Sequence, residues 1–216
     1  MLIVGITGVM GCGKSTVSRL LAQQGAILCD ADQLARQAIA PATPGFQQVV
    51  ERFGQQVVDE HGHIHRPTLA KLAFAHESAL TDLEAIIHPQ VQRLQATFLA
   101  RQPTDSLVVL EIPLLFETGA HHRCDVTLAV VCGCQQEERL ANRPHGQPAW
   151  VKERMLARQL SENDKKQLAD RIIDNSSSLL ETQQAVEGLW PWLLAQPARC
   201  WPQAWKTLME TPIQER

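Results

Sequence analysis

The sequence predicts an α/β fold, with a five-stranded parallel sheet and helices on both of its faces in three layers. Three observations support this prediction. Short apolar segments rich in β-branched residues alternate with helical segments, and a glycine-rich segment joins the first predicted strand to the first helix. About 70 residues separate the second strand from the third, far more than one crossover helix needs. The 216 residues are enough for one or two domains with a sizeable core.

Five short segments have the apolar composition of buried parallel strands. They cover residues 2–7, 26–30, 106–112, 125–132 and 171–175. Apolar residues at helical spacing predict a first helix directly after residue 13. The last long helix is expected to follow Ser178, because Ser178 and Glu181 have the spacing of a capping box.

Two long segments leave the predicted sheet. Residues 41–100 contain expected helices at 46–53 and 69–99, and an insertion of this size is typical of a subdomain over the edge where the strands end. Residues 135–166 are polar, helical and rich in arginine, and prolines and a glycine interrupt them. Ligands of open α/β sheets bind at the carboxyl ends of the strands, so both segments are expected to lie near a binding site.

Composition excludes several classes of function. Hydrophobic residues make up 44% of the chain and charged residues 20%, which is typical of a globular protein. The net charge of −3 argues against non-specific nucleic-acid binding. The sequence has no leader-like amino terminus and no apolar stretch of about 18 residues, so no membrane partner is expected. Six scattered cysteines predict free thiols and a cytoplasmic location.

Residues 8–15 have the pattern G-x-x-x-x-G-K-S, between a predicted strand and a predicted helix, which is the context that supports a phosphate loop. The glycines permit positive φ angles, so that successive N–H groups form an anion nest at the positive end of the helix. Lys14 is expected to reach the β- and γ-phosphates, and the Ser15 hydroxyl to ligate Mg²⁺. The loop predicts a bound nucleoside triphosphate and leaves open whether an acceptor or water receives the phosphoryl group.

Cys12 lies inside this loop. A helix amino terminus lowers the pKa of a thiol, so we expect enhanced alkylation of Cys12 that ATP suppresses. The alternative, a small inert residue at a variable position of the pattern, remains open.

Two further groups of charged residues follow predicted elements at the same edge. Asp30 and Asp32 come at the end of the second strand, and as an i, i+2 pair on extended chain they are expected to point in one direction. One of them is expected to orient an attacking hydroxyl, since phosphoryl transfer depends on positioning. Arg139 and Arg143 are four residues apart on one helical face and would stabilise charge on the transferring group. The alternatives are a helix cap for the aspartates and a solvated face for the arginines.

Seven segments, in register along four-fifths of the chain, resemble the dephospho-CoA kinase family. The Asp-Ala-Asp, His-Pro and Pro-Leu-Leu-Phe-Glu segments make the resemblance specific, since the phosphate loop alone is common to many NTPases. In chain order the segments are GITGVMGCGKST, DADQLAR, HRPTLAKLAF, LEAIIHPQV, EIPLLFE, QQEERLANR and ADRIIDNSS.

The resemblance implies a P-loop NTPase three-layer fold with an inserted helical substrate domain and a lid. The core would comprise residues 1–40, 101–134 and 167–200, the CoA-binding insertion residues 41–100 and the lid residues 135–166. The family transfers the γ-phosphoryl group of ATP to the 3′-hydroxyl of dephospho-CoA ribose, with Mg²⁺. The implied partners are ATP and dephospho-CoA, with no nucleic acid, in a monomer or small homo-oligomer.

The resemblance also implies roles for individual residues. Asp32 would be the base for the acceptor hydroxyl, supported by Asp30, and Arg139, Arg143 and Lys14 would act on the transferring phosphoryl group. The acceptor would further contact Arg66, His88 and Glu117. The nucleotide would contact Gly8, Gly11, Cys12, Gly13, Lys14, Ser15, Thr16 and Asn175.

Several of these assignments have structural alternatives. His88 could cap a helix that begins at Pro89, and Glu117 could cap or pair within the fold. Glu111 stands at the end of the third strand, where a water-mediated contact with Mg²⁺ is expected.

Two other functions remain as alternatives at this point. A different small-molecule kinase, of the nucleotide or shikimate type, would share the loop and lid. A P-loop switch or motor would hydrolyse the nucleotide, although the sequence lacks a guanine-specifying N-K-x-D tetrapeptide.

Overall fold

The computed structural model describes residues 1–141 and 149–210, and these residues form two compact units. The first unit comprises Met1–Asp30, residues 102–141 and Met155–Lys206, and the second comprises Ala31–Arg101, Ala149–Arg154 and residues 207–210. The second unit begins directly after the second strand, ten residues before the expected insertion. The expected division into core, insertion and lid remains a prediction.

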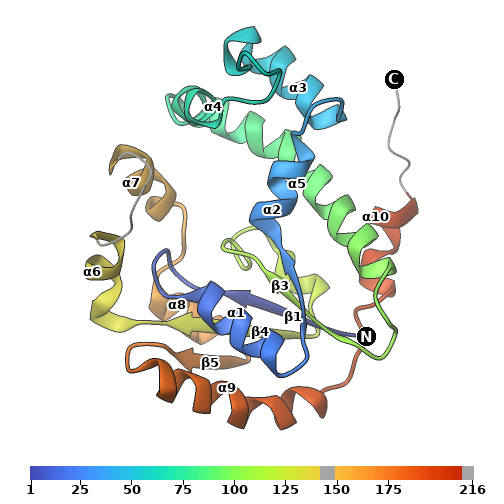
Figure 1. Cartoon of the computed structure of the whole chain (residues 1–216), viewed down its shortest axis with the longest axis vertical. Helices are drawn as coiled ribbons and strands as arrows, with labels where there is room; N and C mark the ends of the chain where they lie inside the picture. The colour runs from blue at the N-terminus through green and yellow to red at the C-terminus, as the bar shows by residue number, and fades with distance from the viewer. Residues whose placement is uncertain (142–148, 211–216) are drawn as a thin grey trace. The chain divides into compact units, whose positions relative to one another are not determined.

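The first unit is built on a parallel sheet whose five strands, among the described residues, lie in the order β2-β3-β1-β4-β5. Figure 1 labels β1, β3, β4 and β5. The predicted α/β class and the number of strands are confirmed. The strands are β1 (Leu2–Thr7), β2 (Ile27–Asp30), β3 (Leu107–Glu111), β4 (Val126–Val131) and β5 (Arg171–Asp174). Strands β1 and β4 are buried along their whole length, which explains their continuous apolar sequences.

Alternate residues of β1 face opposite layers of the first unit. Val4 and Ile6 pack with Leu21 of α1 and Val186 of α9, so these helices cover one face of the sheet (Figure 1). Gly5 faces the other way, where an added Cβ would lie 2.8 Å from Sγ of Cys124. The three-layer arrangement therefore follows from the period-two pattern of the strand.

The helices of the first unit are α1 (Lys14–Gln23), α6 (Gln136–Ala141), α8 (Glu162–Leu168) and α9 (Leu179–Leu194). The predicted capping box at the start of α9 is confirmed: Ser178 accepts from the Glu181 N–H, and the Glu181 carboxylate accepts from the Ser178 N–H. These hydrogen bonds hold the pKa of the Glu181 carboxyl below its usual range. Short 3-10 helices cover Ala120–Arg123, Gly133–Gln135 and Gln203–Trp205.

The second unit has its own apolar core among helices. This core contains Val49, Phe53, Val57 and Leu69. Apolar residues between positions 79 and 87 pack against them. Its helices are α2 (Ala31–Ala38), α3 (Pro44–Phe53), α4 (Arg66–Ala73) and α5 (Glu77–Ala100), with a 3-10 helix at Gln55–Val57; α7 (Ala149–Ala157) and α10 (Lys206–Glu210) extend across the unit boundaries. None of the described helices is both long enough and apolar enough to cross a membrane.

Two sequence expectations for the second unit are corrected. The single helix expected at 69–99 is two helices, because α4 ends at Ala73 and α5 begins at Glu77, whose carboxylate suits the positive end of a new helix. Pro89 lies inside α5, so His88 does not cap a helix that begins there.

Candidate functional site

The phosphate loop, residues 8–16, joins the end of β1 to the start of α1 as the sequence predicts. Gly13 is the N-cap of α1 with φ 90°, in the left-handed region that favours glycine. A Cβ on Gly13 would lie 2.1 Å from Nδ2 of Asn175, so the position has no room for a side chain. The loop therefore needs glycine here for both its conformation and its packing.

Lys14 lies back over the loop that precedes it. Its ammonium donates to the carbonyl oxygen of Gly8 at 3.0 Å and to that of Val9 at 3.5 Å. Backbone carbonyls therefore fix a positive charge at the loop, next to the amino terminus of α1. Both features favour the binding of an anion.

The start of α1 and the ends of β3 and β2 carry oxygen groups at this edge of the sheet. The Ser15 hydroxyl donates to Oε1 of Glu111 at 2.8 Å. Glu111 ends β3 and is the register partner of Asp30, which ends β2, so the two carboxylates project from neighbouring strands at one edge of the sheet. Hydroxyl and carboxylate oxygens are the protein ligands that Mg²⁺ prefers.

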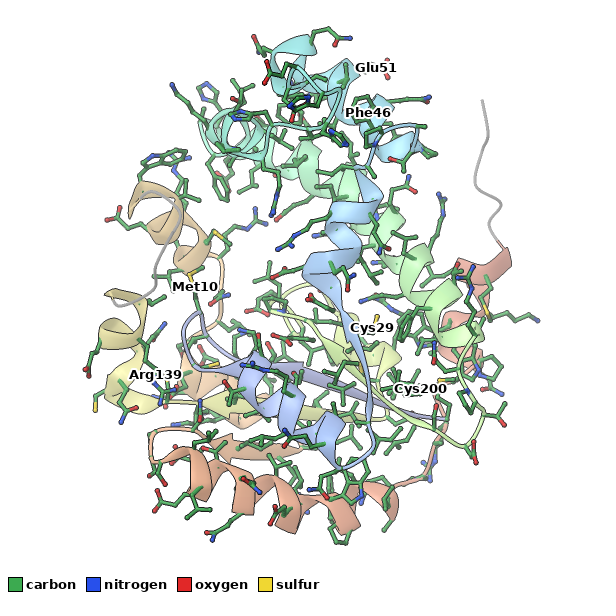
Figure 2. The ribbon with its side chains drawn as sticks, viewed as in Figure 1. Met10, Cys29, Phe46, Glu51, Arg139 and Cys200 are labelled. Carbon is green, nitrogen blue, oxygen red and sulfur yellow. The ribbon has the colours of Figure 1, made fainter. Side chains whose placement is uncertain are left out.

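The carbonyl of Cys12 holds the other side of the loop to the carboxyl end of β5. It accepts from Nδ2 of Asn175 at 2.7 Å and from Nη1 of Arg139 at 3.4 Å. Arg139 also donates to the Asn175 carbonyl at 2.6 Å, and Thr182 donates to Oδ1 of Asn175 at 2.9 Å. The structure therefore brings three predicted site residues, Cys12, Asn175 and Arg139, into direct contact. Figure 2 labels Arg139.

The structure contradicts the reason for expecting a reactive Cys12. Its side chain is fully buried, and burial raises the pKa of the Cys12 thiol more than the nearby Lys14 charge lowers it. The backbone of Cys12 takes part in the structure of the loop: its N–H donates to the Val9 carbonyl, and its carbonyl accepts from Asn175 and Arg139. Desolvation of the thiolate outweighs the helix terminus at this position.

Alkylation should follow exposure rather than loop position. In native protein at mildly alkaline pH, iodoacetamide is expected to modify the exposed Cys134 much faster than the buried Cys12, with or without Mg·ATP. Peptide mapping by mass spectrometry measures the two rates, and protein unfolded in urea is the control in which they should become similar. A Cys12 that reacts as fast as Cys134 in the native protein would contradict the burial.

The expected geometry of the two aspartates is also corrected. Strand β2 ends at Asp30 and α2 begins at Ala31, so Asp32 lies in the first turn of a helix. The two residues are therefore not an i, i+2 pair on extended chain. Asp30 belongs to the first unit and Asp32 to the second, and both are exposed.

Of the remaining predicted residues, Arg66 is the exposed first residue of α4 and His88 lies half-buried within α5. Glu117 forms an ion pair of 2.7 Å with Lys165 in the first unit. This pairing agrees with the structural alternative, and a role of Glu117 toward the acceptor remains a prediction. Arg143 lies outside the described residues.

Sequence reasoning missed three residues that contact the loop or its supporting strand. Gln136 and Gln159 bond the backbone of Met10, and Lys165 donates to the hydroxyl of Thr7 at 3.2 Å. The side chain of Lys165 is only 1% exposed. No local pattern marks any of the three, because each partner lies more than a hundred residues away along the chain.

The sheet, the loop and the Lys14–Ser15 pair at the start of α1 define a P-loop NTPase fold. Comparison with known families narrows this class. The dephospho-CoA kinase family matches residues 2–181. The chain belongs to that family.

Individual relatives agree with this assignment. A dephospho-CoA kinase of Thermobifida fusca is 37% identical, over 88% of this chain and 95% of its own length. One from Bacillus licheniformis is also 37% identical, over 87% of this chain and 94% of its own length. The predicted family resemblance is confirmed.

Solved structures confirm the fold. The Thermus thermophilus protein TT1252 is similar with a TM-score of 0.72 at 35% identity, covering 89% of this chain and 97% of its own. A Campylobacter jejuni dephospho-CoA kinase is similar with a TM-score of 0.60 at 18% identity, covering 88% and 96% of the two chains. At that identity the second likeness concerns the fold alone.

Proposed function

We propose that this chain transfers the γ-phosphoryl group of ATP to the 3′-hydroxyl of dephospho-CoA ribose, giving coenzyme A and ADP in the cytoplasm. The observation that carries the proposal is the phosphate loop with Lys14 and Ser15, in a chain that matches the dephospho-CoA kinase family over residues 2–181. A loop of this kind binds the triphosphate, and the family assignment supports the identity of the acceptor.

The loop and its neighbours would bind the nucleotide. N–H groups of residues 8–16 would surround the β- and γ-phosphates, and Lys14 would leave its carbonyl partners to contact them. Arg139 and Arg143 would balance the charge that develops on the transferring group, while Asn175 would lie near adenine. The contact of Arg139 with Asn175 supports a shared role at the nucleotide.

The residues beside the loop fit a magnesium ion. Ser15 and Glu111 already place a hydroxyl and a carboxylate oxygen 2.8 Å apart, and both are hard oxygen ligands. The described residues hold no group of three or more His, Cys, Asp or Glu side chains that could bind a metal. The protein would therefore supply few ligands beside the phosphate oxygens, as is usual for Mg²⁺. When bound, the ion neutralises charge on the phosphates.

Asp32 would orient the acceptor hydroxyl. It lies at the start of α2, two residues beyond the end of β2, and an exposed carboxylate can accept a hydrogen bond from an attacking hydroxyl. Because the transition state of phosphoryl transfer is loose, orientation contributes more than full deprotonation. Asp30 would support Asp32, and Arg66 and His88 of the helical unit would contact the acceptor.

An acceptor panel tests this function. The chain is incubated with Mg·ATP and dephospho-CoA, adenosine monophosphate, shikimate or no acceptor, and the products are detected by mass spectrometry. Of the acceptors tested, we expect only dephospho-CoA to give a product that is heavier by one phosphoryl group. Phosphorylation of shikimate or of the nucleotide in its place, or ADP release that no acceptor accelerates, would contradict the proposal.

A further inference from the structure

The backbone of Met10, between two glycines of the phosphate loop, is held on both sides by glutamine side chains. The Met10 N–H donates to Oε1 of Gln159 at 2.9 Å, and the Met10 carbonyl accepts from Nε2 of Gln136 at 3.1 Å. All three residues belong to the first unit, and Figure 2 labels Met10. Residues 135–166, the segment expected to form the lid, therefore contact the loop through one residue near each end of the segment.

The chemistry of the peptide group fixes the role of each glutamine. A backbone N–H can only donate and a carbonyl oxygen can only accept, so Gln159 must present its oxygen to Met10 and Gln136 its NH₂ group. The two glutamines therefore act in opposite senses on one residue. Replacement of each by glutamate should have opposite consequences.

A buried ion pair fixes the segment that carries Gln159. The N–H of the next residue, Leu160, donates to Oε1 of Glu117 at 2.8 Å. The same oxygen accepts from Nζ of Lys165 at 2.7 Å, and Lys165 also donates to Thr7, the residue directly before the loop. The segment next to Gln159 is therefore linked to the end of β1 through Glu117 and Lys165, without the contact between Gln159 and Met10.

The position of Met10 affects the residues that hold Lys14. The carbonyls of Gly8 and Val9 accept from the Lys14 ammonium, and Val9 adjoins Met10 directly. A change in the orientation of the Met10 peptide would rotate the Val9–Met10 linkage. The backbone N–H groups that would surround the phosphates, and the path by which Lys14 reaches them, would then change.

We infer that Gln136 and Gln159 are positioning residues for the kinase reaction. They fix the two peptide groups on either side of Met10, Val9–Met10 and Met10–Gly11, in the conformation of the loop that receives ATP. The inference rests on the proposed function, since it assumes that the loop binds ATP.

The experiment compares Gln136→Glu with Gln159→Glu. Both variants place a negative charge beside Met10, so the cost of the charge near the triphosphate is shared. In Gln159→Glu a carboxylate oxygen still accepts from the Met10 N–H. In Gln136→Glu the donor is lost and two acceptor oxygens face each other. We expect the dissociation constant for Mg·ATP, measured by calorimetry without acceptor, to be about tenfold higher in Gln136→Glu than in Gln159→Glu.

Controls separate positioning from folding. Gln167→Glu adds the same charge at an exposed position of α8 and should bind ATP as the unmodified chain does. KM for dephospho-CoA should be the same in both glutamate variants, because only the ATP side is disturbed. If Gln136→Glu does not fold, Gln136→Leu, which removes the donor without adding a charge, takes its place and should bind ATP about threefold more weakly than the unmodified chain.

The outcomes are distinguishable. Equal ATP affinity in the two glutamate variants, whether near normal or weakened, would overturn the inference while leaving the proposed function intact. If KM for ATP and KM for dephospho-CoA rose together in Gln136→Glu, that result would overturn the inference as well. An unmodified chain that does not bind Mg·ATP would overturn the proposed function itself, and the inference with it.

Discussion

Asp32→Asn should lower kcat by about 10³-fold while the affinity for Mg·ATP stays near that of the unmodified chain. The carboxylate would accept the hydrogen of the acceptor hydroxyl through either oxygen, whereas the amide has a single acceptor oxygen and an NH₂ group that cannot take up the proton. In the proposed function the loop of the first unit binds the nucleotide, whereas Asp32 belongs to the second unit. The substitution should therefore change turnover and not ATP binding.

Steady-state kinetics with dephospho-CoA, together with ATP calorimetry, measure both effects. The matched control is Asp105→Asn, at an exposed aspartate in the turn before β3, and it should be indistinguishable from the unmodified chain. If Asp32→Asn keeps most of its turnover, Asp32 is not the group that orients the hydroxyl. A loss of ATP affinity equal to the loss of turnover would likewise contradict the assigned role.

Lys165→Met should destabilise the fold by about 3 kcal/mol or more. The side chain of Lys165 is 1% exposed, and its three hydrogen-bond acceptors are Thr7, Pro113 and Glu117. Burial lowers the pKa of the Lys165 ammonium, and the hydrogen bond from Lys165 to Glu117 acts in the opposite direction. Removal of the ammonium leaves the Glu117 carboxylate with an uncompensated charge, which is the costly part of breaking a buried pair.

Urea unfolding followed by circular dichroism gives the free energies. Lys166→Met is the matched control, because Lys166 is the next residue of α8 and its ion pair with Glu162 is partly exposed; its cost should stay below about 1 kcal/mol. Adding Glu117→Gln to Lys165→Met should restore part of the lost stability. Equal stabilities of the two lysine variants would show that the buried ion pair contributes nothing of its own.

The parts of the fold that sequence could predict are those determined by local chemistry. The buried segments of β1 and β4 are apolar except for Thr7 and Thr127, the loop carries its glycines next to Lys14, and the capping box at Ser178 needs only residues of one turn. Each of these signals lies within a few neighbouring residues. The same holds for the family resemblance, which rests on short segments in order.

The errors arose where distant parts of the chain decide the outcome. The thiol of Cys12 is buried by residues from other elements, so its helix-terminal position did not set its pKa. Asp30 was expected to continue an extended chain, but the pairing of β2 with β3 ends at Asp30 and a helix follows at once. A lysine is normally expected at the surface, but Lys165 is buried against the Glu117 carboxylate. The sequence around Lys165 does not reveal this, because Glu117 lies 48 residues away.

Locating the phosphate in the product tests the central claim most directly. The purified product of Mg·ATP and dephospho-CoA is examined by ³¹P NMR and by tandem mass spectrometry of its ribose fragment. We predict a single new phosphomonoester on the 3′-oxygen and one ADP for each product molecule. Inorganic phosphate formed in place of a phosphorylated acceptor, or a phosphate on any other oxygen, would contradict the account.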